Sequence, residues 1–162
     1  MSNDRIVKRV LIRAPRNRVW RALADSKEFA AWFGVELEGP FVAGKTVSGV
    51  IVGTLADAEV AELQKVYNGK RMDLVVEAIE PERRLALRWH PHANEEGVDY
   101  SQEPTTLIEF TIEDAPGGVM VTVTESGFDK IPLARRAKAF EANSGGWEMM
   151  VKVLEKYATQ TN

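Results

Sequence analysis

The segment from Pro132 to Asn162 carries apolar residues at spacings of three and four, which predicts one long helix with a single apolar face. The stripe on that face consists of Leu133, Ala137, Phe140, Ser144, Trp147, Val151, Leu154 and Ala158. Such a face has to be buried against another layer, and most of the preceding sequence has the pattern of β-strands. We therefore expect the helix to lie across a sheet, where helix and sheet can enclose a cavity.

Strands are predicted where apolar residues alternate between clusters of turn residues. They span 5–14, 35–41, 46–54, 71–80, 84–90, 105–113 and 119–125. Two short helices are predicted after the first strand. The first begins at Pro15, and the second follows the cap residues Asp25 and Ser26 and ends at Gly34.

Hairpin connections through the middle of the chain imply an antiparallel sheet with the helices on one face, which is an α+β fold. Residues 56–66 fit a short helix or an irregular insertion, and residues 91–104 fit a polar loop. The 162 residues show no internal repeat and no linker, so we expect a single domain over residues 1–162. A domain of this size can bury about 70% of its unfolded surface.

The composition excludes several classes of function. Cysteine is absent, which excludes thiol catalysis, thiolate zinc sites and disulfides, and fits a cytoplasmic location. The 21 Lys and Arg against 24 Asp and Glu give a formal net charge of −3, so we expect no nucleic-acid partner. The first residues lack the apolar core of a secretory signal, and no apolar run approaches the roughly 20 residues that cross a bilayer. We therefore expect no membrane insertion.

The segment Gly39–Thr46 satisfies the phosphate-binding pattern Gly-x4-Gly-Lys-Ser/Thr. That chemistry needs a helix after the loop, so that backbone N–H groups converge on the phosphate. Here Val47–Gly53 follows, which is β-branched and glycine-rich and predicts a strand, and Pro40 removes one N–H group. We therefore interpret the segment as a hairpin turn. The chain also lacks a Gly-x-Gly-x-x-Gly fingerprint, and we predict no cofactor.

His90 and His92 lie just before three carboxylates, a combination that suits several divalent ions. However, Leu85, Leu87 and Trp89 alternate on one face of a predicted strand, which directs His90 to the opposite, outer face. We interpret both histidines as part of a solvated loop and predict no metal site. No motif for a nucleophile is present either, so we assign no catalytic residue.

Glu125 is in phase with Val119, Val121 and Val123 and therefore with the inward face of its predicted strand. A desolvated carboxylate in that position could orient a ligand or take part in proton transfer. The alternative is that the side chain leaves the sheet at the end of the strand or pairs with an arginine.

Aromatic and apolar side chains on the elements beside the predicted gap form the predicted wall of a ligand cavity. They are Trp32, Phe33, Trp89, Phe110, Phe140, Trp147 and Val151. Glu125 and Asn143 would supply polar groups, and Tyr100 in the polar loop would cover the mouth. Ordinary core packing is the alternative for each aromatic side chain. Gly145 and Gly146 each cost about 1 kcal/mol in a helix interior relative to Ala, which favours close packing or a bend at the cavity.

Motifs along almost the whole chain carry a resemblance to a known superfamily. They are Ala14-Pro15 with Val19–Leu23, Trp32-Phe33-Gly34, Glu80–Leu85 with Arg88-Trp89, Thr124–Phe128, and Gly145-Gly146-Trp147. With the order of elements, they resemble the helix-grip superfamily of START domains and birch-pollen-allergen-like proteins, the SRPBCC group. More narrowly, the chain is similar to bacterial homologues of the activator of heat-shock-protein ATPase. The resemblance implies a curved antiparallel sheet wrapped around a long C-terminal helix, with two short helices after the first strand.

Three possible functions follow from the inward-facing side chains predicted above and from this resemblance. The first is binding of a small hydrophobic or aromatic ligand between the C-terminal helix and the sheet. The second is an enzyme of the polyketide cyclase, dehydratase or hydrolase type, in which Glu125 and polar neighbours position the substrate. The third is a co-chaperone-like module that interacts with another protein. A homodimer is also left open.

Overall fold

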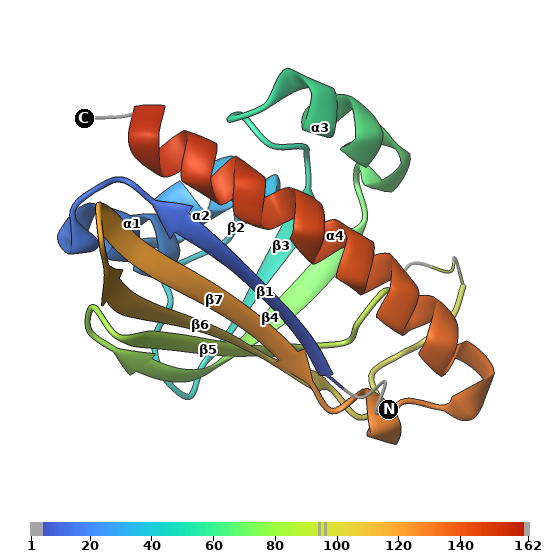
Figure 1. Cartoon of the computed structure of the whole chain (residues 1–162). Helices are drawn as coiled ribbons and strands as arrows, with labels where there is room; N and C mark the ends of the chain where they lie inside the picture. The colour runs from blue at the N-terminus through green and yellow to red at the C-terminus, as the bar shows by residue number, and fades with distance from the viewer. Residues whose placement is uncertain (1–4, 94, 96, 161–162) are drawn as a thin grey trace.

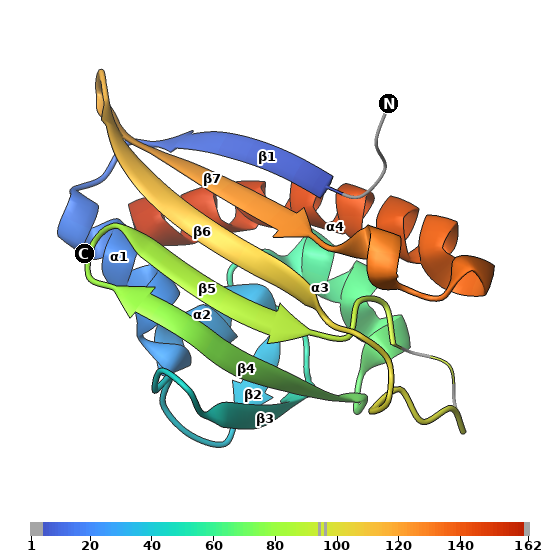
Figure 2. The same cartoon turned by 90° about the horizontal axis from the view of Figure 1, so that it is seen from below.

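One curved antiparallel sheet organises the fold, and the α-helices of the described chain lie on one face of it (Figure 1, Figure 2). The computed structural model describes residues 5–93, 95 and 97–160. In chain order the elements are β1 (Arg5–Ile12), α1 (Arg16–Ala24), α2 (Ser26–Phe33), β2 (Val35–Leu37), β3 (Thr46–Ile51), α3 (Ala58–Gln64), η1 (Lys65–Tyr67), β4 (Arg71–Glu80), β5 (Arg84–Trp89), β6 (Thr106–Ala115), β7 (Gly118–Ser126), η2 (Phe128–Lys130) and α4 (Leu133–Gln160). The predicted α+β, helix-grip architecture is confirmed.

The sheet brings the two ends of the chain together. Its seven strands run in the order β1-β7-β6-β5-β4-β3-β2, and all neighbours are antiparallel. In this register Glu125 on β7 lies between Ile6 on β1 and Ile108 on β6. Residues 56–66, for which the sequence left two readings, contain α3 and the start of η1.

Local sequence signals explain where α2 begins and ends. The Asp25 carboxylate accepts hydrogen bonds from the backbone N–H groups of Lys27 at 2.9 Å and Glu28 at 3.2 Å, which is an N-cap. At the other end Gly34 has a φ of 96°, and a Cβ there would lie 2.7 Å from the backbone nitrogen of Thr54. Only glycine fits both the backbone angle and the space, so the chain turns sharply into β2.

The predicted apolar stripe of the long helix is only partly buried. Trp147, Val151, Leu154 and Ala158 are buried in the core, as predicted, whereas Leu133 is 78% exposed and Ala137 is also exposed. The first turns of α4 extend past the end of β7, so no strand lies opposite them (Figure 1, Figure 2). Periodicity predicted the helix correctly, but it could not show where the sheet ends.

The segment with the phosphate-binding pattern is a turn that leads into a strand, as predicted. Thr46 is the first residue of β3, and the backbone N–H of Gly44 donates to the Val76 carbonyl at 2.8 Å. In the described part of the chain, every helix is too short or too polar to pass through a lipid bilayer. Asn94 and Glu96 of the predicted loop and Asn162 at the predicted end of the helix lie outside the described residues.

Candidate functional site

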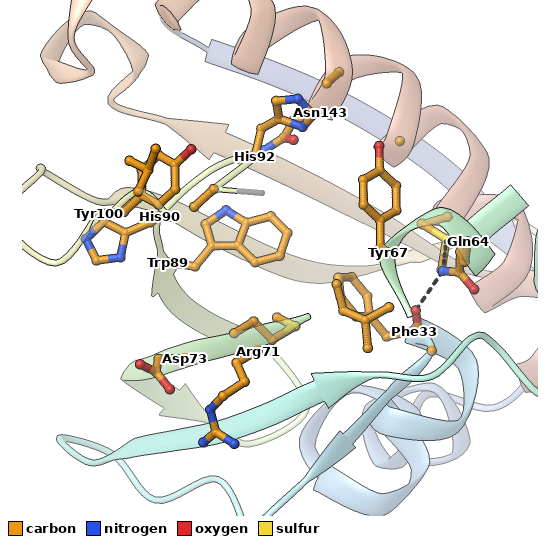
Figure 3. Close-up of a pocket in the computed structure, with 18 of the residues that line it drawn as sticks. Phe33, Gln64, Tyr67, Arg71, Asp73, Trp89, His90, His92, Tyr100 and Asn143 are labelled. Carbon is orange, nitrogen blue, oxygen red and sulfur yellow. Dashed lines mark hydrogen bonds between the residues drawn. The ribbon is translucent and has the colours of Figure 1, made fainter. Parts of the chain in front are cut away.

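A cavity of about 570 Å³ opens beneath α4, between α3 with η1, the strands β3 to β5, and the chain that follows β5 (Figure 3). Its volume falls in the range of pockets that hold small molecules, roughly 300–1,000 Å³. The apolar part of its lining comes from Phe33, Ile51, Met72, Trp89, Met149 and Met150. The cavity therefore combines the aromatic side chains of Phe33 and Trp89 with three methionines, which adapt readily to the shape of a bound molecule.

Three aromatic rings pack against one another at the inner end of the cavity. The ring centroid of Phe33 lies 6.0 Å from Trp89 and 5.9 Å from Trp147, and the two indoles are 6.1 Å apart. Phe33 and Trp89 line the cavity, whereas Trp147 lies behind them with 4% of its surface exposed. Mutual contact among three rings restrains each of them, so this end of the cavity is preformed.

The Glu125 carboxylate lies fully buried behind this aromatic group and accepts hydrogen bonds from four side chains. Oε1 accepts from the indole N–H of Trp147 at 2.8 Å, and Oε2 accepts from that of Trp89 at 2.7 Å. Thr106 Oγ1 donates to Oε2 at 2.6 Å. The Asn143 side-chain nitrogen lies 3.0 Å from Oε1 and 3.2 Å from Oε2.

Every partner of Glu125 is neutral, and both of its oxygens act as acceptors. Among the described residues it forms no ion pair with a lysine or arginine. A polar group buried in this way is costly unless donors replace the lost water. Glu125 therefore fixes the four side chains around it, and two of these, Trp89 and Asn143, face the cavity.

The local sequence explains how these donors converge. Alternation along β7 turns Glu125 inward after Val119, Val121 and Val123, all of which are buried. Asn143 and Trp147 are four residues apart in α4 and therefore lie on one face of the helix. The predicted inward direction of Glu125 is confirmed, and the two alternatives, exposure at the strand end or pairing with an arginine, are not observed.

Arg135 on the first turn of α4 holds the loop that follows β5, which lies at the mouth of the cavity and which it contacts at Pro91, Tyr100 and Glu103. Its guanidinium donates to the Glu103 carboxylate at 2.7 Å and to the Pro91 carbonyl at 2.8 Å. It also lies 4.7 Å from the ring centroid of Tyr100, a cation–π distance. One side chain thus fixes both ends of the segment and the aromatic ring between them, and Tyr100 lines the cavity.

His90 and His92 lie in the loop after β5 and are partly exposed, but both line the cavity, so the outward direction predicted for His90 was wrong. β5 ends at Trp89, and strand alternation therefore gives no information about the direction of His90. Nε2 of His90 lies 3.0 Å from the Glu103 carbonyl oxygen. Burial lowers the pKa of His92 below its ordinary value, and the nearby charges of Lys138 and Arg135 lower it further.

α3 and η1 contribute polar side chains to the site that the sequence did not indicate. The side-chain nitrogen of Gln64 donates to the Phe33 carbonyl at 3.1 Å (Figure 3). The side-chain oxygen of Gln64 accepts from the Thr54 backbone N–H at 2.7 Å. Gln64 thereby fastens α3 to the end of α2, and Tyr67 lines the cavity beside it. These contacts are distant in sequence, and no motif marks them.

The structure places the ten predicted ligand contacts in three groups. Phe33, Trp89, Tyr100 and Asn143 line the cavity. Glu125 and Trp147 lie directly behind that lining. Four lie elsewhere in the packing, namely Trp32, Phe110, Phe140 and Val151.

The last group has packing partners of its own. Trp32 donates its indole N–H to the Ala22 carbonyl at 2.8 Å, and Phe140 lies edge-on to Phe128 at 5.2 Å. The direct ligand contact of each of the ten residues stays a prediction. Among the described residues, no group of three or more His, Asp or Glu side chains is arranged to hold a metal ion.

Gly146 faces the cavity, and a Cβ at either Gly145 or Gly146 would meet nothing within 4 Å. Close packing, one of the two explanations offered by the sequence, is therefore absent at both glycines. At Gly146 the space that a side chain would fill belongs to the cavity. α4 therefore gives up helix stability at a position where a larger residue would reduce the cavity volume.

Comparison with known proteins agrees with this fold. The family model described as Activator of Hsp90 ATPase homolog 1-like protein matches residues 13–159. No curated protein matches the chain significantly. Among solved structures, MLL2253 from Mesorhizobium loti is similar with a TM-score of 0.70 and 21% identity, over 98% of both chains.

Two further solved structures are also similar to this chain. DynU16, a protein of the dynemicin biosynthetic locus, has a TM-score of 0.68 and 24% identity, over 97% of this chain and 48% of its own. The solution structure of the Aha1 dimer from Colwellia psychrerythraea has a TM-score of 0.62 and 18% identity, over 93% of this chain and 92% of its own. At these identities the likeness establishes a shared fold.

Proposed function

The chain belongs to the Activator of Hsp90 ATPase homolog 1-like family, and we propose that its cavity binds a small, largely apolar ligand. The observation that supports this most is the combination of an open cavity of about 570 Å³ with a preformed inner end. Glu125 holds Trp89 and Asn143 in that end by hydrogen bonds of 2.7 to 3.2 Å. A buried carboxylate with four donors is a costly way to fill space, and it is better suited to keeping a binding surface in one geometry.

The geometry of Glu125 favours binding over proton transfer by that residue. Both of its oxygens are already occupied by donors, and the residue is 0% exposed. A general acid or base has to come within hydrogen-bond reach of the substrate. We therefore rank an enzyme that uses Glu125 as acid or base below a binding protein. Occurrence of the similar DynU16 in a biosynthetic locus keeps a cyclase-like enzyme as the alternative.

Two further predictions about partners accompany the proposal. A homodimer is supported by the similar Aha1 dimer, and light scattering behind a sizing column measures it directly. A co-chaperone-like interaction is supported only by the family, and a pull-down with a purified heat-shock ATPase tests it. A cytoplasmic location stays a prediction from the absence of cysteine.

The proposal is tested by filling the cavity from α4. Phenylalanine at position 146 projects into the cavity, whereas phenylalanine at the neighbouring, exposed position 145 does not, so Gly145→Phe is the matched control. Native mass spectrometry of freshly purified protein detects a retained ligand as excess mass. Binding of 1-anilinonaphthalene-8-sulfonate, followed by fluorescence, provides a second measurement on all three proteins.

We expect the wild type and Gly145→Phe to bind the probe, and Gly146→Phe to lose at least tenfold in affinity. Circular dichroism and thermal unfolding confirm that both variants are folded. Equal binding by Gly146→Phe and wild type would show that the probe does not use this cavity and would overturn the proposal.

A further inference from the structure

The side-chain amide of Asn143 has a fixed orientation. Its nitrogen lies 3.0 and 3.2 Å from the two carboxylate oxygens of Glu125. A carboxylate that already accepts hydrogen bonds from three other side chains can face the amide nitrogen but not the amide oxygen, because two acceptors would repel each other. The hydrogen-bond partners therefore exclude the flipped amide. The Asn143 carbonyl oxygen consequently points away from Glu125.

That oxygen is a polar atom which the cavity offers to a ligand beside the Trp89 indole. Asn143 lines the cavity and is partly exposed, and its Oδ1 accepts no hydrogen bond from the described residues. The indole N–H of Trp89 is already used by Glu125 at 2.7 Å. This part of the cavity therefore presents an acceptor beside an apolar indole, and Tyr67 and His92 are further polar side chains of the lining.

The Glu125 carboxyl group strengthens this asymmetry. It lies directly behind Asn143 and Trp89, and its oxygens take up the N–H groups of both. With those donors already used, this part of the lining favours a ligand group that donates and opposes a second acceptor. A ligand group that could only accept would lose its water without gaining a partner, which carries a full desolvation cost.

We propose that the ligand carries a neutral hydroxyl or N–H group on an aromatic or similarly apolar frame and donates that hydrogen to Oδ1 of Asn143. This inference rests on the proposed function, because it specifies the ligand of the same cavity. It predicts that recognition depends on a donor rather than on apolar surface alone. A site built to bind a hydroxyl group rejects an analogue that lacks it much more strongly than it rejects a missing methylene.

The test compares pairs of probes in which a methyl ether replaces the hydroxyl group and so removes the donor. The first pair is 2-naphthol and 2-methoxynaphthalene, and the second is 4-phenylphenol and 4-methoxybiphenyl. Isothermal titration calorimetry on the wild-type protein measures both members of each pair. We expect the hydroxyl compound of at least one pair to bind ten or more times more tightly than its methoxy partner.

Two variants separate recognition from stability. Asn143→Leu removes the acceptor, and we expect the preference for hydroxyl over methoxy to fall below about twofold (roughly 0.4 kcal/mol or less) while the methoxy compound still binds. Thr106→Val is the matched control, because Thr106 also donates to Glu125 but is fully buried and does not line the cavity. It should retain the tenfold preference, although its melting temperature falls as well.

The outcomes distinguish this inference from the proposed function. If hydroxyl and methoxy compounds bind equally to the wild type, and Gly146→Phe abolishes both, the cavity is a ligand site but the donor requirement is wrong. If Gly146→Phe binds either pair as the wild type does, or if none of the four probes binds the wild type, the proposed function fails together with this inference. Should Asn143→Leu fail to fold, the comparison of probes on the wild type still decides the donor requirement.

Discussion

The indole N–H of Trp147 donates to Oε1 of Glu125 at 2.8 Å and thereby ties α4 to β7 of the sheet. Both residues are almost completely buried, with exposed fractions of 4% and 0%. A helix and a sheet can slide along each other when only apolar side chains separate them. A hydrogen bond between fixed partners defines their relative position, and the cavity beneath α4 depends on that position.

Replacement of Glu125 by glutamine should destabilise the protein by about 1–3 kcal/mol. Glutamine offers one acceptor oxygen in place of two, so at least one buried indole or side-chain donor loses its partner. Urea unfolding, followed by tryptophan fluorescence, measures the change in free energy of unfolding. The matched control is Glu113→Gln on β6, which is exposed and should stay within about 0.5 kcal/mol. Equal urea midpoints for Glu125→Gln and wild type would contradict the assigned role.

Alanine at Gly145 or Gly146 should stabilise the protein by about 1 kcal/mol each, because both glycines lie inside α4 and an added Cβ meets nothing within 4 Å. Thermal unfolding detects this as a higher melting temperature. Gly34→Ala is a useful contrast, since its φ of 96° and the Thr54 backbone oppose any side chain, and it should lower the melting temperature. A loss of stability at Gly146 would indicate that α4 requires a glycine bend there.

Arg135→Ala should increase the mobility of residues 97–103 at the cavity mouth without unfolding the sheet. The variant loses the contacts to Glu103, to the Pro91 carbonyl and to the Tyr100 ring. Hydrogen exchange of the backbone amides in residues 97–103 should accelerate, and bound probe should dissociate faster. Arg136→Ala controls for the loss of a positive charge, because among the described residues Arg136 donates only to the nearby Ile131 carbonyl. Unchanged exchange in Arg135→Ala would rule out its role as an anchor.

His92 should titrate below its ordinary value near 6.5, because burial and the charges of Lys138 and Arg135 disfavour its protonated form. The unfolded chain then binds more protons than the folded chain between the lowered pKa and 6.5. The stability that His92 contributes is complete above about pH 6.5. It is lost as the pH falls through the pKa that His92 has in the folded chain. NMR titration of the two histidine rings measures this pKa. Lys138→Ala should raise it, and a pKa above 6.5 in the wild type would contradict the prediction.

Features that depend on local periodicity could be predicted from the sequence. The alternation of Val119, Val121 and Val123 correctly placed Glu125 on the buried face of the sheet. Helical spacing placed Asn143 and Trp147 on the face of α4 that meets it. Both patterns report which side of an element a residue occupies. They do not report which residues meet across elements, so the four donors to Glu125 could not be identified together.

The parts of the site that were missed depend on where elements end. His90 was placed outside because alternation was continued one residue beyond Trp89, the last residue of β5. Leu133 was assigned to the buried stripe because the sequence does not show that α4 extends past the sheet. Gln64 and Tyr67 reach the cavity only because α3 is fastened to the end of α2, a contact between residues far apart in the chain.

The pairing of β1 with β7 has a consequence for biosynthesis. The first strand of the described chain, Arg5–Ile12, has β7, Gly118–Ser126, as its one neighbour in the sheet. During translation β1 therefore leaves the ribosome long before β7 is made, and Ile6 and Ile12 have no partner strand until then. Contacts so distant in sequence slow folding and leave strand edges open to other chains. Among the strands of the described sheet, β1 thus stays unpaired for the longest stretch of synthesis.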